Sequence, residues 1–338
     1  MSFSALVRPW LDELDGIGWL NFQGHRMTSL RCIRDVTIRP ELLRAAVRFW
    51  DPKVQVFRFG FHELCPTMEE FHAYLGGFDL ETPVIPLHGV NFANVLSANL
   101  GISNKAAKSM LQGGTINIPR IIAQFRPEGF ALCLCLLAAF LFVWSDGQAS
   151  SSLVGVTMQI EGRKDVAPMV LAETLMGLDR VHAGDTNVFE GSALLLQVIA
   201  WRLSWLDNPA MTVSNMGHQR VILAGLSCWT FYIPNRILRQ LGVRQIIPPP
   251  ENFVMPNHNF ATFRAYQNTW RERVTIPRDQ YPSVNLSKRY VRWLIRDMET
   301  RELDLNVPEI NCLDPRDASC EVMLCCLFCV LKVSCSAM

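Results

Sequence analysis

The chain has 338 residues, of which 49% are hydrophobic and 19% are charged, and its formal net charge at pH 7 is +1. This length suffices for one large domain or two ordinary ones, and the apolar fraction excludes global disorder. The near-neutral balance excludes a histone-like or acidic-tail protein, although it is compatible with a local basic face.

The N-terminal segment and the cysteine content indicate the compartment. The first residues lack the apolar core of a signal peptide and soon turn acidic, at Asp12, Glu13 and Asp15. The chain has 11 cysteines, an odd number. We therefore expect an intracellular protein that is not secreted and whose thiols are free.

Residues 40–76 predict a helix, a short strand and a second helix, in that order. Pro40 suits the first position of a helix, where its missing N–H costs nothing. The Val- and Phe-rich residues 53–61 predict the strand. Thr67 and Glu70 have the spacing of a capping box, so the second helix should begin there.

The middle of the chain has the periodicity of helices rather than strands. We expect helices over residues 92–100, 104–112, 116–125, 128–144, 166–178, 192–205 and 218–232. Residues 130–144 are uncharged, but this stretch is shorter than the roughly 20 residues that a membrane-spanning helix needs. It therefore predicts a buried core helix and no membrane association.

These patterns together predict a mainly α-helical fold, a large globular domain with one small strand element near residues 53–61. Pro248, Pro249 and Pro250 cannot continue a helix and predict a stiff hinge over residues 246–256. The hinge separates a helical core, residues 1–245, from C-terminal helices within 257–301 that pack back on it. Residues 302–338 read as an irregular acidic segment followed by a Cys-rich apolar tail.

Motifs of catalysis are missing from the sequence. It has no G-x-S-x-G, P-loop, H-E-x-x-H or G-x-G-x-x-G pattern. His62, Glu63 and Cys65 resemble metal ligands, but only His72 lies close enough in sequence to join them, so an ordinary turn is favoured. Cys326 and Cys329 have a zinc-like spacing in an apolar context that argues against zinc. We predict no catalytic residue, no metal and no cofactor, with an enzyme of unknown reaction as a remaining alternative.

One surface invites a binding hypothesis. Residues 264–301 hold nine basic and four acidic residues, with aromatic residues between them. Arg with interleaved aromatics suits phosphate contact and base stacking, and it also suits protein interfaces. A third interpretation is that the segment forms two amphipathic helices whose aromatic residues lie in the core and whose arginines face the solvent. The candidate residues for a nucleic-acid or partner surface are Arg264, Tyr266, Trp270, Arg273, Arg289, Arg292, Trp293 and Arg296.

Three stretches carry a family resemblance. The sequences Arg-Phe-Trp-Asp-Pro at 48–52, Val-Phe-Arg-Phe-Gly at 56–60 and Glu-Leu-Cys-Pro-Thr-Met-Glu-Glu-Phe at 63–71, followed by Tyr74-Leu75-Gly76, resemble the plant mobile domain. This is the aminotransferase-like domain of plant retroelements and their domesticated descendants. The resemblance covers roughly residues 6–300 and is most specific at 48–76.

The resemblance implies a non-enzymatic interaction protein of retroelement origin. Domesticated members of the family are nuclear and are implicated in transposon silencing and gene expression. Some associate with a plant serine/threonine phosphatase, which would here be a separate partner. Despite the family's name, this sequence offers no pyridoxal lysine: its six lysines lie among solvent-type residues.

Overall fold

The structure is a computed structural model that describes residues 4–14, 43, 46–59, 62–75, 82–143, 147–186, 188–198, 210–250, 252–277 and 286–300. About 49% of the described residues are helical and 17% lie in strands. The fold is therefore mixed α and β, and the prediction of a mainly α-helical fold was wrong. The strands form four small antiparallel sheets between the helices.

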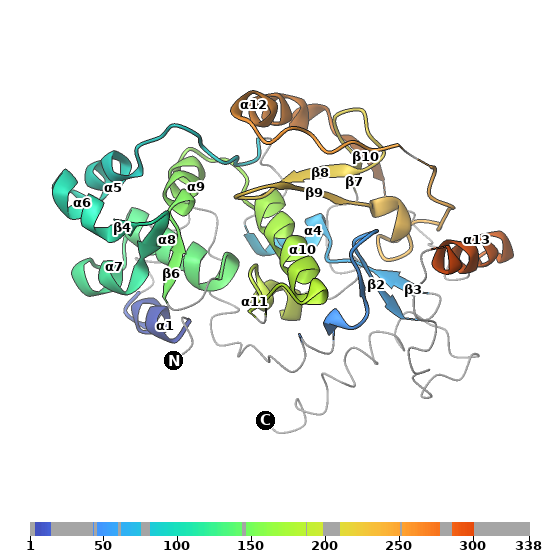
Figure 1. Ribbon diagram of the computed structural model, residues 1–338, viewed down its shortest axis with the longest axis horizontal. Coiled ribbons are helices and arrows are strands. Elements are labelled where there is room, and N and C mark those ends of the chain that lie inside the picture. Colours follow the sequence, from blue (N-terminus) through green and yellow to red (C-terminus); the bar gives the residue numbers. More distant parts are fainter. Residues whose placement is uncertain are drawn as a thin grey trace, which may run out of the picture.

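The side of the molecule at the left of Figure 1 is mostly helical around a short sheet. Its central helix α8 continues into a π-helical turn and packs against α7 and α9. The elements here are α1 (Ser4–Asp12), α5 (Phe92–Leu100), α6 (Asn104–Met110), β4 (Leu111–Gln112), β5 (Thr115–Asn117), α7 (Ile118–Gln124), α8 (Gly129–Leu136), η3 (Leu137–Leu141), β6 (Gln148–Ser150) and α9 (Ser152–Glu161).

The other side contains most of the sheet structure. The long helix α10 packs against α4 and against the hairpin β8–β9. The elements here are β1 (Trp50–Asp51), β2 (Val56–Phe59), β3 (His62–Leu64), α4 (Met68–Leu75), α10 (Ala167–Ala183), α11 (Ala193–Val198), β7 (Ala210–Ser214), β8 (Val221–Ala224), β9 (Trp229–Tyr232), η4 (Pro234–Arg236), α12 (Phe260–Thr269), η5 (Trp270–Glu272), β10 (Val274–Pro277) and α13 (Lys288–Glu299).

Several local predictions are confirmed. Every residue from Phe130 to Phe142 is buried, as expected for a core helix. No helix in the described part of the chain is long and apolar enough to cross a membrane. The Thr67 hydroxyl accepts from the Glu70 amide (3.3 Å), which is the capping contact expected before α4, and it donates to the Glu70 carboxylate (2.9 Å). The expected strand near 53–61 is present as β2, within the three-stranded sheet β1-β2-β3.

The helix predicted over 218–232 is instead the antiparallel hairpin β8–β9. Both strands are mostly buried, so the sequence is apolar at nearly every position and shows no strand alternation. Such short apolar runs cannot be assigned by period alone. The predicted helices over 104–112 and 116–125 are likewise shortened, because Gly113-Gly114, both at positive φ, form the two-residue turn between β4 and β5.

The C-terminal helices pack against residues that precede the three prolines. Phe263, Tyr266 and Trp270 of α12 and η5 are fully buried, and Phe263 stacks on Trp229 of β9 with ring centroids 4.4 Å apart. Tyr290 and Leu294 of α13 are buried too. The predicted tail, residues 302–338, lies outside the described residues, as does the predicted helix end at 199–205.

Gly177 of α10 should tolerate no side chain. An added Cβ would lie 1.7 Å from the backbone oxygen of Glu190, which cannot move as a side chain can. We expect Gly177→Ala to lower the free energy of unfolding by about 3 kcal/mol or more, measured by urea denaturation. The control is Gly155→Ala in α9, where the added carbon meets only the flexible side chains of Leu87 and Phe92. Equal stability losses in both variants would contradict the close approach at Gly177.

Candidate functional site: the arginine face of α13

The candidate residues of the 264–301 segment do not form one surface. Tyr266 and Trp270 are fully buried, so neither ring can stack on a base. The helices that carry the remaining candidates are also far apart, because α12 lies at the top of the view and α13 at its right edge (Figure 1). The structure therefore divides the predicted surface into two unrelated parts.

The part on α12 and η5 is largely structural. Arg264 is exposed, whereas the other candidates on α12 and η5 are buried or half-buried. Arg273 is half-buried: its guanidinium lies 5.4 Å from the centre of the Trp270 ring and donates to the Trp270 carbonyl (3.0 Å). This arginine caps the end of η5 over a core aromatic ring.

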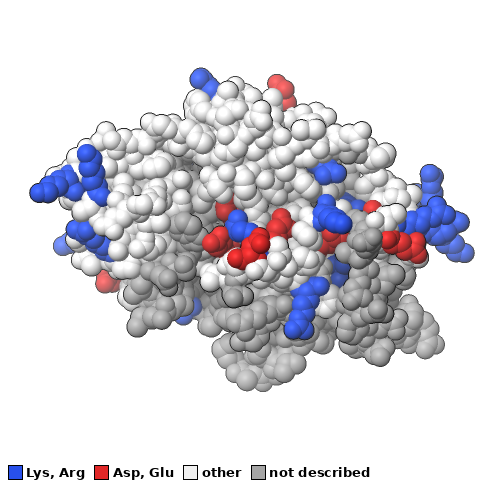
Figure 2. Space-filling model, in the orientation of Figure 1, with Lys and Arg blue, Asp and Glu red and all other residues white. Residues whose placement is uncertain are grey.

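The part on α13 is a true exposed face. Ser287 caps the helix by accepting from the Tyr290 amide (3.1 Å). Arg289, Arg292 and Arg296 follow the helical spacing of three and four residues and are all exposed. Figure 2 shows Lys and Arg gathered at this end of the molecule, over α13, and again at the opposite end, over α6 and α7. We call Arg289, Arg292 and Arg296 the α13 arginine face.

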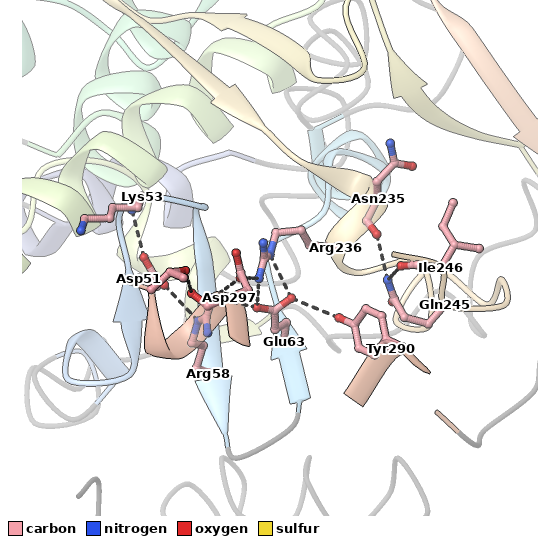
Figure 3. A network of polar contacts seen from close by, with 11 residues as sticks. Asp51, Lys53, Arg58, Glu63, Asn235, Arg236, Gln245, Ile246, Tyr290 and Asp297 are labelled. Carbon is pink, nitrogen blue, oxygen red and sulfur yellow. Dashed lines mark hydrogen bonds and ion pairs between the residues drawn. The ribbon is translucent and has the colours of Figure 1, made fainter. Parts of the chain in front are cut away.

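The opposite face of α13 is fixed by a buried ion cluster (Figure 3). Glu63 of β3 accepts two hydrogen bonds from Arg236 of η4, at 2.6 and 3.0 Å, and one from the Tyr290 hydroxyl at 3.3 Å. Arg236 also donates to Asp297 of α13 at 2.7 Å. Elements β3, η4 and α13 are therefore joined at the Glu63 carboxylate.

Arg58 completes this cluster from β2. It is the direct cross-strand neighbour of Glu63 and lies 3.0 Å from that carboxylate. It also forms ion pairs with Asp51 of β1 (3.0 Å) and with Asp297 (3.6 Å). The ion cluster is thus Asp51, Arg58, Glu63, Arg236 and Asp297, two cations with three carboxylates.

Burial and charge act against each other in the cluster. The side chains of Glu63 and Arg236 are only 2% and 5% exposed. Burial, together with the charge of Arg236, lowers the pKa of Arg58, while Glu63 and Asp51 oppose this shift. Burial and the Glu63 charge raise the pKa of Tyr290, so its hydroxyl stays protonated and can donate. The Trp293 ring lies 5.0 Å from the guanidinium carbon of Arg236 and covers it on the helix side.

The ion cluster was not predicted from the sequence, although the positions of Arg58 and Glu63 in the sequence indicate that these two residues pair. Arg58 of β2 and Glu63 of β3 oppose each other in register, so a prediction of two paired strands over 56–64 would have placed them side by side. Arg236 joins them across 173 positions of sequence, and no local pattern indicates such a pairing.

The metal-ligand candidates among residues 62–72 have other partners in the structure. Glu63 belongs to the ion cluster, the Cys65 backbone pairs with the Gln240 side chain (2.9 and 2.7 Å), and His72 contacts Asp165. Burial and the charge of Arg239 lower the pKa of His62 to about 4. Within the described ranges no three His, Cys, Asp or Glu side chains are grouped to hold a metal ion.

His72 and Asp165 form a second buried polar pair, which joins α4 to the segment before α10. Asp165 also accepts from the amide of Ala167, the first residue of α10, at 2.9 Å. Burial alone lowers the pKa of His72, but the charge and hydrogen bond of Asp165 outweigh it, so the net shift is upward. Glu69 and Arg273 act on the same ring, with opposite signs.

A scan against protein-family models and searches of curated proteins and of solved structures each found no match to this chain. The resemblance to the plant mobile domain thus remains a prediction from residues 48–76.

Removing Glu63 should detach α13. The variant Glu63→Ala leaves two buried guanidinium groups without their shared carboxylate, and we expect the free energy of unfolding to fall by about 3–5 kcal/mol. Amide hydrogen exchange in α13 should accelerate as well. The matched control is Glu299→Ala on the exposed side of α13, which should change stability by less than about 0.5 kcal/mol. Unchanged exchange in α13 after Glu63→Ala would refute its docking role.

The His72–Asp165 pair predicts a pH dependence of stability. Because the folded-state pKa of His72 is raised, its contribution is fully present below the unfolded pKa of about 6.5 and is lost as pH rises through the folded value. We therefore expect the free energy of unfolding to fall more steeply with rising pH in the wild type than in His72→Gln. Parallel pH profiles from denaturant titrations would show that the pair does not hold a proton.

Proposed function

We propose that this chain is a non-enzymatic interaction protein, resembling the plant mobile domain, that acts in the nucleus and binds an acidic protein partner. The observation that carries the proposal is the α13 arginine face: Arg289, Arg292 and Arg296 are exposed along one side of a helix whose other side is fixed by buried ion pairs. A row of guanidinium groups on a docked helix complements a row of carboxylates on a partner.

The bonding of the buried carboxylates supports a scaffold rather than a reaction centre. Glu63 joins β3, η4 and α13, and Asp165 joins α4 to the start of α10. Glu173 of α10 accepts from the Leu226 amide (2.6 Å) in the turn of the β8–β9 hairpin. Each of these carboxylates thus satisfies groups from other elements, as structural ionic groups do.

The family resemblance supplies the proposed context of the partner. A plant serine/threonine phosphatase, silencing of transposons and control of gene expression are what that resemblance implies. The contact that we propose pairs the α13 arginine face with an acidic surface of that partner.

Direct nucleic-acid binding is the second candidate function, favoured by the spacing of the same three arginines, which suits a row of phosphates. It is the weaker candidate because Tyr266 and Trp270, the aromatic residues proposed to stack on bases, are fully buried. Trp293, the remaining aromatic candidate, lies on α13 but is half-buried beside Arg236.

Charge reversal on α13 tests both candidates. We expect the triple variant Arg289→Glu, Arg292→Glu, Arg296→Glu to lose the proteins that the wild type captures from plant nuclear extract, measured by quantitative mass spectrometry. The control variant Lys105→Glu, Lys108→Glu carries exposed charge reversals on α6 and should retain them. Circular dichroism should report the same fold for all three proteins.

Two outcomes would count against the proposal. If the α13 variant captures the same proteins as the wild type, the arginine face is not the contact. If instead the wild type binds duplex DNA or single-stranded RNA with an affinity that falls steeply with salt, and the α13 variant does not, nucleic acid replaces protein as the partner.

A further inference from the structure

We propose that residues 246–250, Ile-Ile-Pro-Pro-Pro, form a preordered polyproline II ligand for a partner domain with an aromatic-lined groove. We call these residues the proline strap. The proposal concerns a different surface from the α13 arginine face and does not depend on it.

The sequence fixes the backbone shape of the proline strap. Each proline ring holds φ near −65°, and a residue before proline favours extended over helical backbone. Ile247, Pro248 and Pro249 each precede a proline, so all three favour extended backbone. The described residues contain no cis peptide bond. A run of trans prolines with these constraints is a polyproline II helix.

Side-chain hydrogen bonds fix the N-terminal end of the proline strap (Figure 3). Gln245 is buried, and its amide donates to the backbone carbonyls of Asn235 (2.8 Å) and Ile246 (3.1 Å). Its carbonyl oxygen accepts from the Arg239 amide at 3.3 Å. The strap therefore starts from a fixed point beside η4.

Aromatic contacts fix the chain on the C-terminal side. The Phe253 ring lies 5.6 Å from that of Phe231 in β9, and the Arg220 guanidinium lies 5.3 Å from Phe253. A few residues later the Trp229 indole donates to the carbonyl of Asn257 (3.4 Å). The described residues between these anchors have no regular secondary structure and lead from η4 to α12 (Figure 1).

Between the anchors several apolar side chains are exposed, whereas Ile247 and Pro248 are half-buried. Pro249 and Pro250 are exposed, and Ile246 is 49% exposed. Of the eight large hydrophobic residues that are exposed in the described part of the chain, four lie between positions 246 and 260: Ile246, Val254, Met255 and Phe260. An exposed apolar concentration of this kind on an anchored segment is typical of a contact surface.

The proline strap fits one recognition mode better than the others. Its prolines lack the N–H groups that strand addition to a sheet needs, and they cannot form a helix that enters a groove. Pyrrolidine rings on a polyproline II backbone instead pack between aromatic side chains, as in SH3, WW and EVH1 grooves. Because both ends are already held, little conformational entropy is lost when such a domain binds.

The test uses the full chain and three purified probes, an SH3, a WW and an EVH1 domain, each isotopically labelled for NMR. We expect at least one to bind saturably, with shift changes at its groove aromatics. The variant Pro249→Ala, Pro250→Ala should weaken that binding about tenfold or more, which corresponds to about 1.4 kcal/mol. Ile246→Asp should weaken it as well, because it places a charge at the exposed apolar edge.

Matched controls separate this surface from the rest of the molecule. Pro277→Ala changes an exposed proline at the end of β10 and should leave the affinity unchanged. The α13 triple variant should also bind the probes like the wild type, so that this result and the nuclear capture experiment can fail independently. All variants should melt like the wild type. The proposal is overturned if no probe binds, or if the proline variant binds as tightly as Pro277→Ala.

Discussion

The shared carboxylate of Glu63 is the constraint on which the position of α13 and its junction with η4 depend. It receives Arg58 from the neighbouring strand, Arg236 from η4 and Tyr290 from α13. Removing these charges from water costs several kcal/mol per ion, and only near-ideal geometry offsets this cost. The cluster therefore adds little net stability as a whole, but it penalises every arrangement of α13 in which one member is left unpaired. Its main effect is on specificity of packing.

One proposed binding surface is positioned by this cluster, and the other begins beside it. Tyr290 and Asp297 hold one face of α13 against the cluster. The opposite face, with Arg289, Arg292 and Arg296, is therefore exposed. Asn235, the residue before Arg236, accepts the Gln245 hydrogen bond that fixes the start of the proline strap. The short helix η4 thus contributes one contact to each surface, through Arg236 to α13 and through Asn235 to the proline strap.

The sequence predicted the features that depend on local chemistry. The helix cap at Thr67 and the amphipathic α13 require only residues within one or two turns, and both are present. The hairpin β8–β9 was missed because burial on both faces removes the alternation that marks a strand, and the Gly113-Gly114 turn was overlooked between two helical patterns. The ion cluster could be predicted only for the pair Arg58 and Glu63, because Arg236 and Asp297 reach it through tertiary packing.

Ionic strength should act differently on the three interactions, which follows from where their charges lie. The α13 arginine face is exposed, so salt screens its attraction for a partner beyond about 8 Å at physiological concentration. The ion cluster is buried and is screened far less, so α13 stays docked under the same conditions. The proline strap contacts its partner through apolar rings, and salt leaves this contact intact or strengthens it. A complex that dissociates in salt while the fold persists is therefore held by the arginine face, and one that survives is held by the strap.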